Sequence, residues 1–293
     1  MAAPVVVGYT ATDAGADALA LGARIAVATG SVLEIVMVLP GERSVITPPD
    51  AGYDRHVRER AREWLARASE TLKDTVAHGR HVRYGESFAE GLIAAAAEFG
   101  AGMIVVGAAN GGLRGRHRLG TVANELMHSS DVPVVLAPEG AREVAASVGI
   151  QRVTAAIGTR PGGDVLLAEA ASLATASGAP LRLLSLATVD LPAGVDTGVI
   201  RLTEATHAET VLAQARTSLG EGSVAEVVSA QGADIEDAVS QIEWLPGEIA
   251  MVGSSRLAQP RRLFLGSTAA KMLHVLPVPM IVVPRTRNAE GAR

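Results

Sequence analysis

The sequence has 293 residues, of which 48% are apolar and 19% charged, and its formal net charge is −5. This length allows one large domain or two ordinary ones, and the composition is that of a chain that buries a full core rather than a disordered one. The first 145 residues carry 14 basic and 17 acidic side chains, and the remainder carry 12 and 14, so neither half is basic. Nucleic-acid binding by phosphate neutralisation is therefore disfavoured.

Residue usage disfavours several further classes of protein. The chain has no cysteine, which excludes disulfides, zinc–thiolate sites and cysteine nucleophiles. No apolar run reaches the roughly 18 residues that a membrane span needs, so we expect no membrane partner. The N-terminus opens directly on a strand pattern and lacks the basic-then-apolar form of a secretion signal, so we expect a cytoplasmic protein.

Two long segments repeat each other at a constant offset of 146 residues. The letters VVG that end at Gly107 return as MVG ending at Gly253, and LGT around Gly120 returns as LGS around Gly266. The segment VPVVLAP at 132–138 likewise returns as VPMIVVP at 278–284. Such a repeat indicates a duplicated domain. We place the copies at residues 1–140 and 150–288, with the small, polar stretch 139–149 as the linker.

Each copy has the pattern of strands alternating with helices. In the first copy we expect strands at residues 5–8, 33–39, 81–84, 103–107 and 133–137. Helices are expected before Gly30, along an apolar stripe from Val57 to Val76, and at 88–99 and 121–129. The second copy should have strands at 153–157, 181–186, 224–228, 249–253 and 280–283, and helices ending at Gly178 and covering 202–219, 235–242 and 268–276. This alternation predicts an α/β fold with a doubly wound, five-stranded parallel sheet in each copy.

The fourth strand of each copy ends in a glycine and leads through a loop to Gly-Thr or Gly-Ser at the start of a helix. Glycine lets the backbone approach an anion, the first amides of the helix point outward, and the helix dipole favours negative charge. Ligands of open α/β sheets bind at the carboxyl ends of the strands, where this loop lies. In one copy alone, a chain turn followed by an N-cap would explain the pattern as well. The same spacing in two copies favours a binding site inherited by duplication.

The pattern resembles the universal stress protein motif, G-x2-G-x9-G-[ST]. The first copy has Gly107, Asn110, Gly120 and Thr121 at the motif positions, and the second has Gly253, Arg256, Gly266 and Ser267. The resemblance covers both halves and implies a tandem member of that family, with a Rossmann-like, adenine nucleotide α-hydrolase-like fold in each copy. It further implies ATP, ADP or AMP at the end of the sheet and pairing through the last strand of each copy. By position, further contacts would come from Thr10, Val38, Val122 and Thr268, with Leu186 as the approximate counterpart of Val38.

The sequence departs from the motif in ways that separate the two copies. Asn110 and Arg256 replace the second motif glycine, and Asn visits left-handed backbone geometry more cheaply than Arg. Arg256 would either fill the space of the phosphates or contact them. Thr10 and Gly158 stand where the family often has an aspartate, which weakens the case for Mg²⁺-assisted binding, and more so in the second copy. The first copy is therefore the better candidate site.

Three functions are compatible with these residues. The first is a regulatory protein of the stress response that binds adenine nucleotides, and the second is an interaction scaffold that has lost nucleotide binding. The third, a slow ATPase, lacks an evident general base because no carboxylate immediately follows the first strand of either copy, so we expect no enzyme activity. Cationic side chains lie in the loop that follows the fourth strand of each copy, where they would either bind phosphate groups or remain solvated. They are Arg114, Arg116, His117, Arg118, Arg261 and Arg262.

The last strand of each copy is short and apolar, and we expect it to lie at the edge of its sheet. Exposed apolar sheet edges invite pairing. We expect the two copies to pair within one chain, and two chains to form a homodimer.

Overall fold

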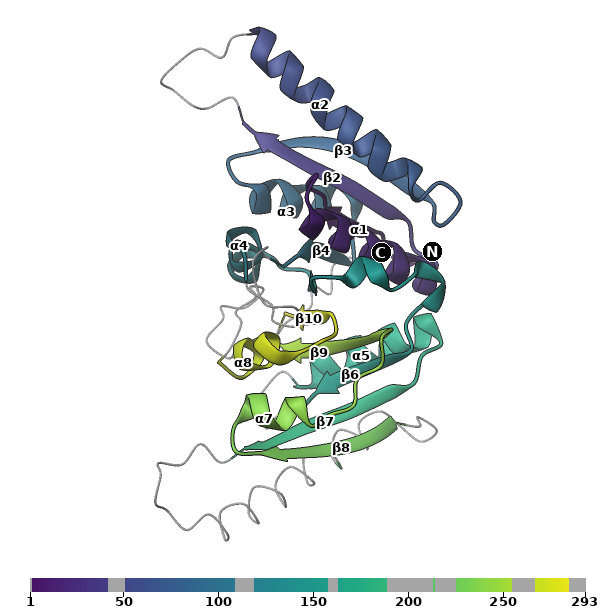
Figure 1. The fold of residues 1–293 in the computed structure, drawn as a ribbon, viewed down its shortest axis with the longest axis vertical. Helices are drawn as coiled ribbons and strands as arrows, with labels where there is room; N and C mark the ends of the chain where they lie inside the picture. The colour runs from purple at the N-terminus through teal and green to yellow at the C-terminus, as the bar shows by residue number, and fades with distance from the viewer. Residues whose placement is uncertain are drawn as a thin grey trace.

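All ten strands that the structure describes lie in one continuous sheet. The structure, a computed structural model, describes residues 2–41, 51–108, 119–157, 163–188, 213, 225–254 and 267–284. The strand order is β3-β2-β1-β4-β5-β10-β9-β6-β7-β8 (Figure 1). Strands within each half are parallel, and the halves meet through the antiparallel pair of β5 and β10. The expected doubly wound sheets, and their pairing within the chain through the last strands, are confirmed.

The first half has the expected order of elements, with small differences in bounds. Its strands are β1 (Val5–Gly8), β2 (Leu33–Pro40), β3 (His78–Gly85), β4 (Met103–Gly107) and β5 (Val134–Ala137). Its helices are α1 (Asp13–Thr29), α2 (Ala51–Glu70), α3 (Phe88–Phe99) and α4 (Thr121–Ser129). The expectation for α2 was too long, because the helix ends at Glu70 and a turn carries Leu72 into the core. β3 begins three residues earlier than its apolar residues suggested.

The second half repeats this plan. Its strands are β6 (Arg152–Ala156), β7 (Leu181–Thr188), β8 (Ala225–Gly232), β9 (Glu248–Gly253) and β10 (Met280–Val283). Its described helices are α5 (Gly163–Ser177), α7 (Ile235–Ser240) and α8 (Ser267–Val275). The helix expected at 202–219 lies outside the described residues except for position 213. α7 ends two residues earlier than expected and is half as long as α3, its counterpart.

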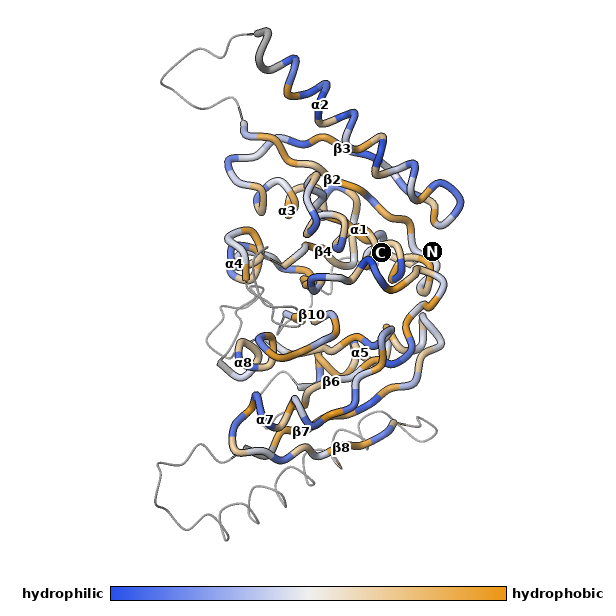
Figure 2. Tube along the Cα trace, in the orientation of Figure 1, coloured by the Kyte–Doolittle hydropathy of each residue, from blue (hydrophilic) through white to orange (hydrophobic). Residues whose placement is uncertain are grey.

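Alternate side chains of the central strands feed two large cores, one on either face of the sheet, and a small third cluster lies between β7, β8 and α7. Val5 and Val7 face the core that contains α1, α2 and α5, whereas Val6 faces the core that contains α3, α4, α7 and α8. Both cores run through the two halves of the chain. Figure 2 shows largely apolar central strands, and α2 as mostly hydrophilic with apolar positions in between. Because both cores extend across the junction, apolar area buried on each face of the sheet helps to hold the two halves together.

The stretch expected to be a plain linker is folded against α1. It forms two short 3-10 turns, η1 (Ala141–Glu143) and η2 (Ala146–Val148). Asp17 of α1, only 2% exposed, accepts hydrogen bonds from the backbone amides of Gly140 at 3.2 Å and Arg142 at 3.0 Å. The Arg142 guanidinium also contacts the side chains of Asp13 at 2.8 Å and Asp17 at 3.8 Å. These bonds hold the linker in one place, since a buried carboxylate requires such donors.

Candidate functional site

The start of α4 has the form that an anion site requires. Gly120 is the N-cap, with extended backbone angles of φ −73° and ψ 166°, and no side chain caps the helix. The Asn124 amide donates to the Gly120 carbonyl at 2.9 Å, which closes the first helical turn. The three amides before it, of Thr121, Val122 and Ala123, therefore have no partner within the helix. Thr121 is exposed and Val122 half-buried, so the helix start is accessible from solvent on this side.

Gly107, the last residue of β4, lies against the first turn of α1. A Cβ atom at this position would come within 2.1 Å of the Ala14 carbonyl oxygen. Since real Cβ atoms do not approach backbone that closely, the packing of α1 on β4 by itself requires glycine here. The sequence suggested that this glycine lets a ligand approach the backbone. In the structure, the first turn of α1 occupies the position next to it.

Thr10 contacts Thr12, the N-cap residue of α1. Its hydroxyl lies 2.9 Å from that of Thr12, and the Thr12 hydroxyl accepts the amide of Gly15 at 3.3 Å. The structure thus brings Thr10 and Gly107 together around the first turn of α1. The Thr10 hydroxyl can still accept or donate a further bond, because a hydroxyl has one donor and two acceptor positions.

Val38 is a core residue by its side chain. It is 8% exposed, and it packs so closely on α3 that a Cβ at Gly91 would lie 2.5 Å from Val38 Cγ1. Leu186, its approximate counterpart in β7, is half-buried. The contact of the Val38 backbone with an adenine edge stays a prediction.

The matching glycine of the second half makes a looser contact with the residues that the structure describes. Among them, a Cβ at Gly253 would meet only Leu166 Cδ2, at an ordinary 3.9 Å. Ser267 begins α8, and Thr268 is half-buried in its first turn. Several predicted site residues lie outside the described residues: Asn110, Gly158, Arg256, Gly266 and the cationic loop residues at 114, 116–118, 261 and 262.

The structure reveals an acidic side chain near the start of α4 that the sequence analysis missed. The Ser87 hydroxyl, which caps α3 by accepting the Glu90 amide at 3.1 Å, donates to Glu125 Oε1 at 2.5 Å. This bond joins the N-cap of α3 to the second turn of α4. The S-x-x-E capping box at 87–90 was visible in the sequence, but the partner 38 residues further on was not.

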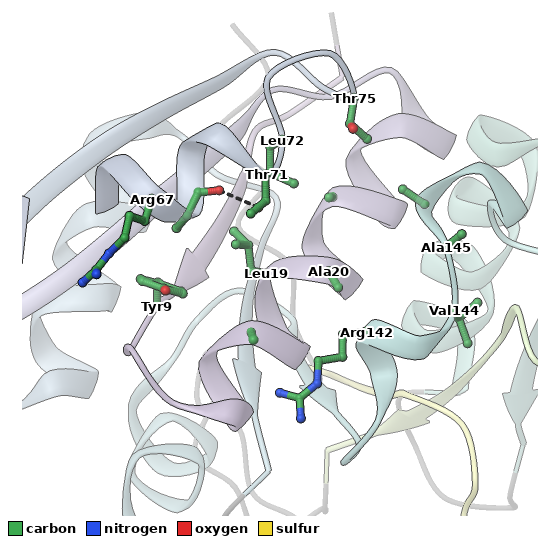
Figure 3. Close-up of a pocket in the computed structure, with 14 residues that line it drawn as sticks. Tyr9, Leu19, Ala20, Arg67, Thr71, Leu72, Thr75, Arg142, Val144 and Ala145 are labelled. Carbon is green, nitrogen blue, oxygen red and sulfur yellow. Dashed lines mark hydrogen bonds between the residues drawn. The ribbon is translucent and has the colours of Figure 1, made fainter. Parts of the chain in front are cut away.

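A hollow of 490 Å³ lies beside Tyr9, on the face of the sheet that α1 and α2 cover. Figure 3 shows Arg67 and Tyr9 on one side of it and Val144 and Ala145 on the other, with Leu19 and Ala20 of α1 between. Burial raises the pKa of the Tyr9 hydroxyl, and the positive charge of Arg67 opposes that shift. None of the predicted site residues lines this hollow.

The part of the chain that the structure describes holds no group of three or more His, Cys, Asp or Glu side chains placed to bind a metal ion. Within those ranges, no helix is long and apolar enough to cross a membrane.

Comparison with known proteins identifies the family. The model of the universal stress protein family matches residues 1–138 and again residues 149–284. The chain belongs to the universal stress protein family. It is a tandem member, because two family units follow one another along almost the whole sequence.

Universal stress proteins of other organisms align with this chain over almost their whole length. Universal stress proteins of Mycobacterium tuberculosis (strain H37Rv) and Mycobacterium bovis are each 30% identical to this chain over 301 aligned residues, which cover 96% of it and 99% of the relative. Among solved structures, a universal stress protein of Archaeoglobus fulgidus has a TM-score of 0.66 at 18% identity, covering 96% of this chain and 98% of its own. A putative universal stress protein of Pseudomonas aeruginosa has a TM-score of 0.60 at 16% identity, covering 97% and 93%. At these identities the solved structures support the fold alone.

Proposed function

We propose that this tandem universal stress protein is a cytoplasmic regulatory protein of the stress response that binds ATP, ADP or AMP in its first half. The observation that carries the proposal is the uncapped start of α4, where Gly120 leaves the amides of Thr121, Val122 and Ala123 without helical partners. A helix start of this kind holds phosphate by its amides and its dipole. The same motif spacing in both halves supports a site rather than a simple turn.

In this proposal, residues at the ends of β1, β2 and β4 complete the site around that helix start. Gly107 ends the neighbouring strand, and Thr10 presents a hydroxyl at the start of α1. In this proposal Val38 contributes backbone groups, and Asn110 and Val122 line the phosphate loop. Gly253, Arg256, Gly266, Ser267 and Thr268 form the weaker second site. The units span residues 1–140 and 150–288, and chains associate as homodimers.

The site is proposed to bind rather than to catalyse. Thr10 supplies a hydroxyl but no carboxylate after β1, so the first half lacks a general base at that place. Metal-assisted binding through Mg²⁺ is less favoured for the same reason. Regulation would then follow from occupancy of the site by one nucleotide or another.

A second candidate, an interaction scaffold without nucleotide, is favoured by one observation. Gly107 is explained by its contact with Ala14 alone, so this glycine does not by itself require a ligand. Arg256 at a motif glycine position adds to that case in the second half.

Nucleotide release and thermal shift separate the two candidates. The regulatory protein should release an adenine nucleotide on heat or acid treatment, and ATP, ADP or AMP should raise its melting temperature by mass action. Gly120→Val adds bulk at backbone angles open to any residue, and it should weaken binding at least about tenfold, or about 1.4 kcal/mol. Gly266→Val is the matched control. No released nucleotide and no shift at millimolar concentrations would favour the scaffold.

A further inference from the structure

The hollow beside Tyr9 is bounded by α1, by the end of α2 and by the linker (Figure 3). Its larger apolar side chains are Leu19 of α1, Leu72 just after α2, and Val144 of the linker. Small side chains make up most of the remaining lining: Ala16, Ala20, Ala23, Ala68, Ala145 and Ala146. The volume of 490 Å³ falls within the range of roughly 300–1,000 Å³ that is usual for small-molecule sites.

Two polar groups of this lining have no protein partner. Among the described residues, the Tyr9 hydroxyl makes no hydrogen bond and the Arg67 guanidinium makes no ion pair. The positive charge of Arg67 acts on the Tyr9 hydroxyl, and both residues lie on the same side of the hollow (Figure 3). Neither group is sealed inside the protein, since Arg67 is exposed and Tyr9 half-buried. A ligand in the hollow can therefore reach both.

The charges around the hollow favour an anion. Among the described residues that line it, the charged ones are Arg67 and Arg142, and none carries a carboxylate. The Arg142 guanidinium already contacts the carboxylate of Asp13 at 2.8 Å. Arg67 is therefore the cation that remains for a ligand.

The acidic neighbours of Arg67 in α2 have other partners. Glu63, one turn earlier, contacts Arg60 at 3.3 Å, and Glu70, one turn later, contacts Lys73 at 3.4 Å. Burial raises the pKa of the Tyr9 hydroxyl, so that hydroxyl keeps its proton at neutral pH and can donate it to an anion. One cation and one hydroxyl donor are thus available at the same rim.

We propose that this hollow binds a small carboxylic acid with an apolar body. The carboxylate lies at the rim, where Arg67 supplies a charge-assisted hydrogen bond and Tyr9 a second donor. The body lies on Leu19, Leu72 and the alanines, and binding is driven by the apolar area removed from water. A phosphate group fits less well, because its second charge would have no second free cation. The site is separate from the start of α4 and does not depend on nucleotide binding.

Isothermal titration calorimetry of the full chain with octanoate tests this proposal. Octanoate should bind at one site per chain. Butanoate should bind at least about tenfold more weakly, because each buried methylene contributes about fourfold in affinity. Octanol has a similar body without the charge, and it should bind roughly fivefold more weakly than octanoate.

Substitutions locate the site. Arg67→Met should weaken octanoate binding roughly fivefold, whereas Arg67→Lys keeps the charge and should restore most of the affinity. Tyr9→Phe loses only the hydroxyl and should weaken binding roughly threefold. Ala20 is half-buried in the lining, so Ala20→Leu extends into the hollow and should block binding. Arg60→Met is the matched control, because it makes the same substitution in α2 outside the lining, and it should bind octanoate as the wild type does.

Several results would overturn the proposal. One is a wild-type protein that does not bind octanoate at millimolar concentrations, and another is an unchanged dissociation constant in Arg67→Met or Ala20→Leu. Equal affinity for octanol and octanoate would also overturn it, because the carboxylate would then have no partner. Gly120→Val should keep the wild-type affinity for octanoate, and a loss of octanoate binding in this variant would place the ligand at α4 instead.

Discussion

Arg182 Nη2 lies 2.5 Å from Glu248 Oε1, and both side chains are buried, at 3% and 0% exposed. Glu248 also accepts the Thr154 hydroxyl and, through its other oxygen, Arg152 Nη2 at 2.7 Å. This network covers the sheet of the second half beside the short helix α7. In the first half, the strand register places Glu34 at the position of Arg182, and the Glu34 carboxylate pairs with His81 at 2.6 Å. The Phe99 ring lies against the His81 ring, tilted by 41° and 4.5 Å away between ring centroids. The second half thus has a buried arginine–glutamate network where the first half has a partly exposed histidine–glutamate pair.

We predict that Glu248→Gln lowers the free energy of unfolding by about 3 kcal/mol, because it leaves two arginines facing a neutral group in a buried place. Burial already lowers the pKa of the Arg182 guanidinium, with the charge of Glu248 opposing that shift. Glu226→Gln is the matched control, since Glu226 contacts Arg152 at 3.4 Å with a half-exposed side chain and should cost less than about 1 kcal/mol. Urea unfolding followed by circular dichroism measures both. Equal losses in the two variants would contradict the network.

The two motif glycines should respond differently to alanine. Gly107→Ala would place a Cβ 2.1 Å from the Ala14 carbonyl, and we predict a loss of about 3 kcal/mol as α1 shifts away from β4. Among the described residues, Gly253→Ala meets only Leu166, at 3.9 Å, and we expect it to change stability by no more than about 0.5 kcal/mol. Denaturant unfolding of the pair checks this. A neutral Gly107→Ala would mean that α1 does not pack as described.

Asp17 should decide whether the linker stays on α1. We predict that Asp17→Ala costs about 3 kcal/mol, because two backbone amides lose a charged acceptor. The linker should then be cut faster by trypsin after Arg142, whose side chain is already 40% exposed. Limited proteolysis followed by mass spectrometry gives the rate. Asp13→Ala serves as control, because its carboxylate contacts only the exposed Arg142 side chain. If cleavage after Arg142 were unchanged in Asp17→Ala, the linker would be held by other contacts.

Glu98 should contribute to loss of stability in acid. Its hydrogen bond to Arg83 lowers the pKa of the carboxyl below the ordinary 4.5. A carboxyl with a lowered pKa in the folded state stabilises the protein above its unfolded pKa, and that contribution is lost as the pH falls through the folded value. In Glu98→Gln, the free energy of unfolding should therefore fall less steeply with decreasing pH below about pH 4.5 than in the wild type. Above about pH 6, the slope of that free energy against pH should be nearly the same in both. Unfolding curves from pH 7 to pH 3 measure the slope, with Glu70→Gln, on the exposed face of α2, as the control. Identical slopes for wild type and Glu98→Gln would refute the prediction.

Local pattern was enough to predict most of the secondary structure. α3, α4, β1, β4 and β10 have the bounds expected from apolar period and glycine stops, because those signals act within a few residues. The 146-residue offset similarly predicted two equal sheets and their pairing through apolar terminal strands. The end of α2 could not be predicted, since Leu72 is apolar whether it lies in a helix or in a turn that enters the core.

The sequence alone therefore determined the family motif, the order of the elements and the duplicated plan of this protein, because each is written in spacing and periodicity along the chain. Only the tertiary structure decided which residues meet: Gly107 with Ala14, Asp17 with the linker, Ser87 with Glu125, and Tyr9 with Arg67 at one hollow. The physical reason is that these contacts join segments between 38 and 125 positions apart, or depend on how closely two elements pack. The residues next to a side chain in the sequence do not predict how deeply it is buried or which charged group it pairs with.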